Sequence, residues 1–128
     1  ARSECTRRGL MSGFLWVGFG GAVGAMARYG LGLLFAAQSF PWSTLTINIA
    51  GSVMIGALWS LFAEQAWFLN WGRLFLMVGV LGGFTTFSAF SLDTLLLLND
   101  GRLMAALGYV SASVCFCLLG VWLGTRLG

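Results

Sequence analysis

Residues 82–91, GGFTTFSAFS, combine groups that can bind ions without any formal charge. Gly82 and Gly83 allow a helix to break, and a break frees backbone carbonyls and amides that lipid cannot satisfy. Free carbonyls suit a cation. Phe87 and Phe90 are three residues apart, so both rings project from one helical face. Because phenyl edges carry partial positive charge, such rings can meet a small anion. A flexible kink whose phenylalanines only pack is the alternative.

Two further stripes of polar side chains recur at a spacing of four residues, which places each stripe on one helical face. Their members are Thr44, Asn48 and Ser52 in one segment, and Tyr109, Ser113 and Cys117 in another. Asn48 is the most informative member, because a buried amide is costly without partners and offers two donors. Two plainer explanations stay open. Asn48 would also suit a hydrogen bond that serves only helix association, and hydroxyls on membrane helices commonly bond to their own backbone.

Arg28 lies well inside an apolar segment. A long basic side chain at such a position can extend, or snorkel, to the membrane interface. It can also make a vestibule electropositive and draw anions in. The two interpretations are compatible, and the sequence does not choose between them.

Composition disfavours most catalytic and nucleic-acid-binding classes. The chain has no His, so no His-dependent triad or metal cluster can form. The four acids lie mostly near termini or in connections, and the seven arginines are too scattered for a basic nucleic-acid face. Cys115 and Cys117 point in different directions on a helix and cannot pair with each other. We expect neither an enzyme nor a nucleic-acid-binding protein.

The elements that must position these residues are membrane helices. Of 128 residues, 59% are hydrophobic and 9% charged, and the mean hydropathy is +0.89. A soluble domain carries about a quarter charged residues. Because about 20 apolar residues cross the hydrocarbon, the sequence predicts an all-α membrane protein with four transmembrane helices. The third is broken near the bilayer centre. The expected spans are 10–37, 40–63, 74–98 and 103–125, with a tight turn at Asn-Asp-Gly 99–101.

Residues 1–10 precede Met11, which can serve as a native start. We therefore expect residues 1–10 to be an N-terminal leader, and the sequence does not decide between a native and a foreign origin for it. Residues 11–128 are expected to form a single four-helix transmembrane channel domain.

The arginines give little orientation preference. Without the leader, Arg73 and Arg126 lie on one side of the membrane, against Arg28 and Arg102 on the other. The positive-inside rule then favours neither orientation, so we expect the chain to insert both ways and to pair as an antiparallel dual-topology homodimer. Small residues four apart, such as Gly20 and Gly24, would suit that pairing, or would only pack helices within one chain.

Three segments together resemble the Fluc (CrcB) family of fluoride channels. GVLGGFTTFSAFS at 79–91 resembles that family's broken third helix, and LTINIAGS at 45–52 resembles its second-helix motif around an asparagine. GGAVGAMARY at 20–29 resembles its glycine-rich first helix. The resemblance begins near residue 12 and covers the rest of the chain. It implies a cell-membrane, multi-pass homodimer that exports toxic fluoride passively, through two antiparallel pores.

The resemblance also implies roles for individual residues. A structural sodium ion at the dimer centre would be held by the backbone carbonyls of Gly82 and Thr85 from each chain. The fluoride pore would be formed by Asn48, Phe87, Phe90, Tyr109 and Ser113, and Arg28 would lie at the vestibule. The chain departs from the family at three positions. At Cys117 and Val121 other members carry hydroxyl side chains, which continue the line of polar groups that begins with Tyr109 and Ser113. At Ala89 the family usually has threonine.

Two other classes compete with a fluoride channel. A small dual-topology exporter of cationic compounds, like the small multidrug resistance family, matches in size and number of spans. That class depends on a glutamate in the first span, where this chain has Arg28 and no acid. A structural membrane subunit without transport activity is the third class.

Overall fold

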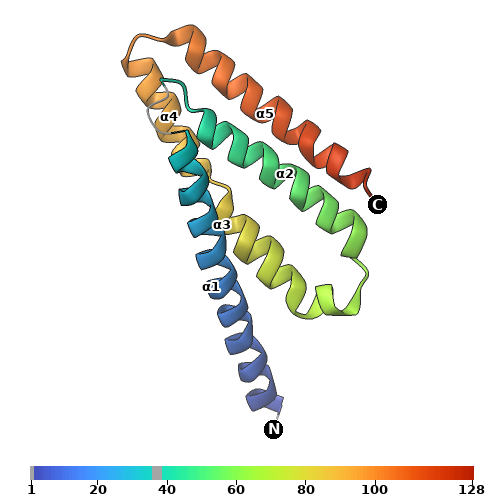
Figure 1. Cartoon of the computed structure of the whole chain (residues 1–128). Coiled ribbons are helices and arrows are strands. Elements are labelled where there is room, and N and C mark those ends of the chain that lie inside the picture. Colours follow the sequence, from blue (N-terminus) through green and yellow to red (C-terminus); the bar gives the residue numbers. More distant parts are fainter. Residues whose placement is uncertain (1, 36–38) are drawn as a thin grey trace.

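The computed structural model describes residues 2–35 and 39–128, and helices make up most of this part of the chain. The elements in order are α1 (Arg2–Leu34), α2 (Trp42–Phe62), η1 (Phe68–Leu81), α3 (Gly82–Phe84), α4 (Phe87–Asn99) and α5 (Leu103–Thr125). Figure 1 shows η1, α3 and α4 following one another along one rod, beside α1, while the N-terminal end of α1 projects beyond the other helices.

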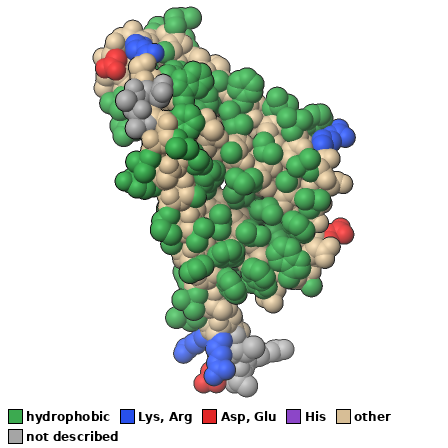
Figure 2. Space-filling model, viewed as in Figure 1, with side chains coloured by type: hydrophobic (Ala, Val, Ile, Leu, Met, Phe, Trp, Pro, Cys, Tyr) green, Lys and Arg blue, Asp and Glu red, His purple; other side chains and the backbone are tan. Residues whose placement is uncertain are grey.

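Four segments are long and apolar enough to cross a membrane, namely Thr6–Leu34, Trp42–Phe62, Phe68–Asn99 and Leu103–Thr125. The predicted all-helical, four-span class is therefore confirmed. Figure 2 shows a broad face covered by hydrophobic side chains, with charged ones at its margins. This distribution is the one that a bilayer requires, and the protein is a multi-pass membrane protein.

Two helix boundaries differ from the predicted ones. α1 is already helical from Arg2, and the predicted end of the first span at Ala37 lies outside the described residues. The third span begins at Phe68 rather than at Leu74, as the π-helix η1. Phe68 is fully buried, and its ring contacts Trp67 and Phe62 with centroids 5.8 and 6.4 Å away. These contacts anchor residues that the sequence had suggested were a connection.

Close backbone packing joins the helices in two pairs, α1 with η1 and α2 with α5. At Gly24, an added Cβ would overlap the carbonyl oxygen of Val80 in η1. At Gly124, it would overlap the carbonyl oxygen of Val53 in α2. In lipid, such approaches gain van der Waals contact that larger residues would prevent. The small-residue pairs thus pack helices within the chain, as the second of the two interpretations held.

The turn between α4 and α5 has the geometry that its Asn-Asp-Gly sequence predicted. Gly101 has φ of 75°, a conformation that favours glycine. Its N–H donates to Leu98 O at 3.0 Å, and the Arg102 N–H donates to Leu97 O at 2.9 Å. This pair of bonds is a Schellman motif, which satisfies the last carbonyls of α4. Arg102 Nη1 also donates to Ser39 O at 2.7 Å and so ties the two connections at this end together.

Candidate ion-binding site

Two extended residues separate α3 from α4. Thr85 has φ −84° and ψ 158°, and Thr86 has φ −152° and ψ 122°. The sequence suggested that Gly82 and Gly83 interrupt the helix, but both glycines lie within α3 and the interruption follows them. Gly83 instead permits close approach, because an added Cβ would lie 3.1 Å from the Gly21 Cα. The β-branched threonines suit extended backbone better than helix.

Asn48 of α2 holds the extended segment through two hydrogen bonds. Its Nδ2 donates to the Thr86 carbonyl at 3.0 Å, and the Thr86 N–H donates to Asn48 Oδ1 at 2.9 Å. In a continuous helix the Thr86 N–H would bond to the carbonyl of Gly82. The amide therefore takes the place of helical bonds, and the second N–H on Nδ2 remains to serve another acceptor.

Two further contacts satisfy backbone groups beside the interruption. Arg28 Nε donates to the Gly83 carbonyl at 3.2 Å. This places a cation at the C-terminal end of α3, where a helix carries partial negative charge. Neither the snorkelling nor the vestibule interpretation predicted that contact. On the other side, Thr86 caps α4, since its Oγ1 accepts the Ala89 N–H at 3.1 Å.

A cavity of about 390 Å³ opens beside the extended segment, with walls from α2, the third span and α5. It brings together most of the predicted site residues, and those that line it are Asn48, Gly82, Thr85, Phe87, Phe90 and Ser113. Two predicted residues lie outside the lining. Arg28 contacts α3 as described above, and Tyr109 is fully buried next to Phe90.

Ser113 carries an unusual hydroxyl. The residue is only 7% exposed, it lines the cavity, and its Oγ has no hydrogen-bond partner among the described residues. The expectation that membrane hydroxyls bond to their own backbone is wrong for Ser113, although it holds for Ser52, whose Oγ donates to Asn48 O at 2.8 Å. A buried hydroxyl without a partner loses about 1–3 kcal/mol. Such a group indicates a ligand that accepts its hydrogen.

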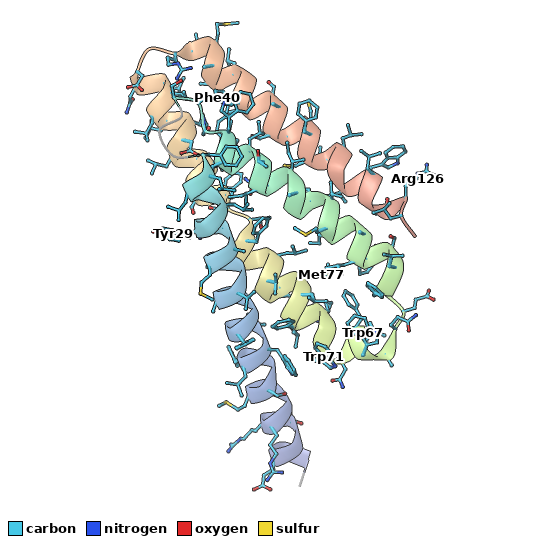
Figure 3. The ribbon with its side chains drawn as sticks, in the orientation of Figure 1. Tyr29, Phe40, Trp67, Trp71, Met77 and Arg126 are labelled. Atoms are coloured by element: carbon cyan, nitrogen blue, oxygen red, sulfur yellow. The ribbon has the colours of Figure 1, made fainter. Side chains whose placement is uncertain are left out.

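Four aromatic rings form a row that begins at the cavity, where Phe87 and Phe90 line the wall. Phe87 is 78% exposed, and its ring centroid lies 5.5 Å from that of Phe90. Phe90 in turn lies 5.1 Å from Tyr109. Phe40, which is labelled in Figure 3, meets the Tyr109 ring edge-on at 5.5 Å and 84°. The spacing of three residues correctly placed Phe87 and Phe90 on the same side of α4.

Asp93 belongs to the same neighbourhood, although sequence reasoning did not select it. Its Oδ2 accepts hydrogen bonds from Thr44 Oγ1 at 2.8 Å and from the Tyr109 hydroxyl at 3.1 Å. These bonds link α2, α4 and α5 and fix the direction of the Tyr109 hydroxyl. The available signal was an acid inside an apolar span, three residues after Phe90, since such acids in membranes are commonly functional.

A family model described as CrcB-like protein, Camphor Resistance (CrcB), matches residues 15–125. The chain belongs to the CrcB family. The match contains all the residues of the cavity, Arg28, which binds the Gly83 carbonyl, and Asp93, which accepts hydrogen bonds from Thr44 and Tyr109.

Several curated relatives of this CrcB family member are named fluoride-specific ion channel FluC. The one from Rhodospirillum rubrum is 50% identical over 117 residues, covering 87% of this chain and 90% of that protein. The one from Opitutus terrae is 48% identical over 119 residues, covering 89% and 90%. One from Thermus thermophilus is 48% identical over 121 residues, covering 92% and 96%. The resemblance found in the three sequence segments is thus confirmed at the level of the family.

Proposed function

We propose that the chain is a fluoride-selective ion channel that lets fluoride leave the cell passively across the plasma membrane. The observation that carries this proposal is the unpartnered Ser113 hydroxyl, which lines one cavity with the Asn48 amide and the rings of Phe87 and Phe90. All four groups are uncharged. The name of the relatives, fluoride-specific ion channel FluC, supports fluoride as the conducted ion.

The chemistry of fluoride suits such a lining. Fluoride is a compact, strongly hydrated anion and an avid hydrogen-bond acceptor. A selective pore must replace its water with donors and still release it. The Ser113 hydroxyl, the second N–H of Asn48 and phenyl edges supply neutral donors. Arg28 is engaged by Gly83 and does not line the cavity, so no full positive charge in the described lining holds the anion in place.

The working unit in this proposal is an antiparallel homodimer with two pores. Thr86 is half-buried, and Ser88 and Ser91, which follow it in α4, are exposed on the single chain at the depth of the third span. Irregular backbone and hydroxyls at that depth require protein or water rather than lipid. A second copy covers this face, and the even division of the arginines of residues 11–128 permits it to insert in the opposite orientation.

A structural sodium ion at the centre of this dimer suits the backbone around Gly82 and Thr85. The Gly82 carbonyl loses its helical donor, because the Thr86 N–H bonds to Asn48 instead. Gly82 and Thr85 both line the cavity. Neutral carbonyl oxygens are suitable ligands for a hard monovalent cation. When bound, sodium would satisfy these carbonyls from two chains and add a fixed positive charge beside the anion path.

An exporter of cationic compounds fits the site less well. Arg28 is the ionisable residue deep in the first span, and the carboxylate of Asp93 in the third span accepts two hydroxyl hydrogen bonds. The site therefore presents donors, rather than a free acid, to its ligand.

The purified wild-type protein, alone in liposomes loaded with potassium fluoride, should release fluoride when potassium is made permeable. Liposomes loaded with chloride should retain it.

Phe87→Ile and Phe90→Ile remove the ring edges but keep apolar bulk, so fluoride efflux should fall by about tenfold or more. A fluoride-selective electrode measures efflux, and size-exclusion chromatography establishes that each variant is a folded dimer. Wild-type efflux in both folded variants would reject the aromatic assignment. No fluoride efflux from the wild type would favour a structural subunit.

Replacement of sodium by a large organic cation should weaken the dimer, because the carbonyl oxygens at the interface would lose the cation that they bind. The fraction of dimer in detergent, measured at falling protein concentration with and without sodium, tests this expectation. Lithium and potassium serve as matched controls for ionic strength. A dimer that is indifferent to sodium, with unchanged fluoride efflux, would count against the site at Gly82 and Thr85.

Single cysteines introduced into the two ends of the molecule test dual topology. In a background without native cysteines, Gln65→Cys and Asp100→Cys, both at exposed positions between membrane spans, should each be labelled by a membrane-impermeant reagent from both sides. The physical reason is the even distribution of arginines described above. Labelling of each position from only one side of the membrane would refute dual topology for this chain.

A further inference from the structure

Two cysteines of α5 lie in different surroundings. Cys117 lines the cavity, whereas Cys115 is exposed and lies outside the lining. Because they are two residues apart on a helix, their side chains point in different directions, as expected from the sequence. Both are free thiols. One thiol therefore faces the cavity, and a second on the same helix faces away from it.

Ser113 supplies an independent indication that a ligand reaches this part of the cavity. It precedes Cys117 by one helical turn, is 7% exposed and carries the unpartnered hydroxyl. Residues four apart on a helix have neighbouring side chains, about 5–6 Å between Cβ atoms. A group bonded to the sulfur of Cys117 would thus lie directly beside the donor that the cavity offers.

The chemistry of Cys117 differs from that of its neighbours in the cavity. A thiol is a weak hydrogen-bond donor, so it adds little to an anion path. As a thiolate it is a nucleophile. The other side chains of the lining are apolar, amide or hydroxyl groups and the thioether of Met77, and none of these reacts with thiol reagents. A small uncharged reagent can reach such a cavity through the bilayer, whereas a bulky charged reagent, unlike a small anion, is excluded from it.

We propose that Cys117 is a covalent modification site inside the cavity, at which small uncharged sulfur electrophiles close the anion path. This inference rests on the proposed channel function. With methyl methanethiosulfonate, the Cys117 thiolate attacks the sulfenyl sulfur and forms a new S–S bond. The bond between the two reagent sulfurs breaks, methanesulfinate leaves with the electron pair, and the thiol proton passes to water.

The physical reason for closure is a gap in the row of donors. The added methylthio group is apolar and lies beside Ser113 in a cavity of about 390 Å³. Fluoride crosses only where donors replace its water at each step. An apolar group at that point interrupts the series of donors along the anion path without any change in charge.

The test measures fluoride efflux from proteoliposomes before and after methyl methanethiosulfonate, each protein being compared with its own untreated sample. Wild type and Cys115→Ser should lose efflux by about tenfold, and dithiothreitol should restore it. Cys117→Ser should show no loss, and Cys117→Ala provides a second variant if serine disturbs folding. Mass spectrometry of peptides reports which thiol was modified.

Three results would overturn the proposal. The first is equal inhibition of wild type and the Cys117 variants. The second is modification of Cys117 with undiminished efflux, and the third is modification of Cys115 while Cys117 stays free. A wild type that releases no fluoride before treatment would reject the channel function itself. Normal efflux without inhibition rejects the thiol site alone.

Discussion

The pair of hydrogen bonds between Asn48 and Thr86 is the interaction on which the rest of the site depends. A membrane span that leaves helical geometry must satisfy each exposed amide and carbonyl within the protein. Asn48 supplies both partners for Thr86 from a neighbouring helix, at 2.9 and 3.0 Å. Because Thr86 remains extended, α4 begins anew at Phe87 and its rings turn toward the cavity. Without that support, the third span would gain by continuing as one helix.

The surrounding packing keeps this arrangement in place. Gly24 and Gly83 bring α1 so close to the third span that Arg28 reaches the carbonyl of Gly83. At the other end, Asp93 links Thr44 and Tyr109 and so joins α4 to α2 and α5. The interruption is therefore fixed from three helices. Ser113, which also belongs to α5, keeps a free hydroxyl, because no group in the described part of the chain accepts its hydrogen.

Local patterns predicted the class of the fold and much of the site. Apolar length located the four spans, since lipid requires about 20 apolar residues in each. Spacing placed Phe87 and Phe90 together, and it placed Asn48 on one face of α2 with Thr44 and Ser52. The exact partners were not predictable in this way, because Asn48 and Thr86 are 38 residues apart and Thr44 and Asp93 are 49 apart. The role of Gly83 was not predictable either. The sequence suggested that this glycine breaks the helix, whereas its close approach to Gly21 shows that it permits tight packing of α1 against the third span.

Fluoride efflux through Asn48→Leu tests the central claim most directly. Leucine has a similar size but leaves the N–H and carbonyl of Thr86 without partners, and each unsatisfied group costs about 1–3 kcal/mol. Because the pore also loses the amide donor and the support of its interrupted backbone, efflux should fall by about tenfold or more, and thermal stability should fall with it. Met54→Leu, an exposed position on α2 outside the cavity lining, should keep both near wild type. A folded Asn48→Leu dimer with wild-type fluoride efflux would contradict the account.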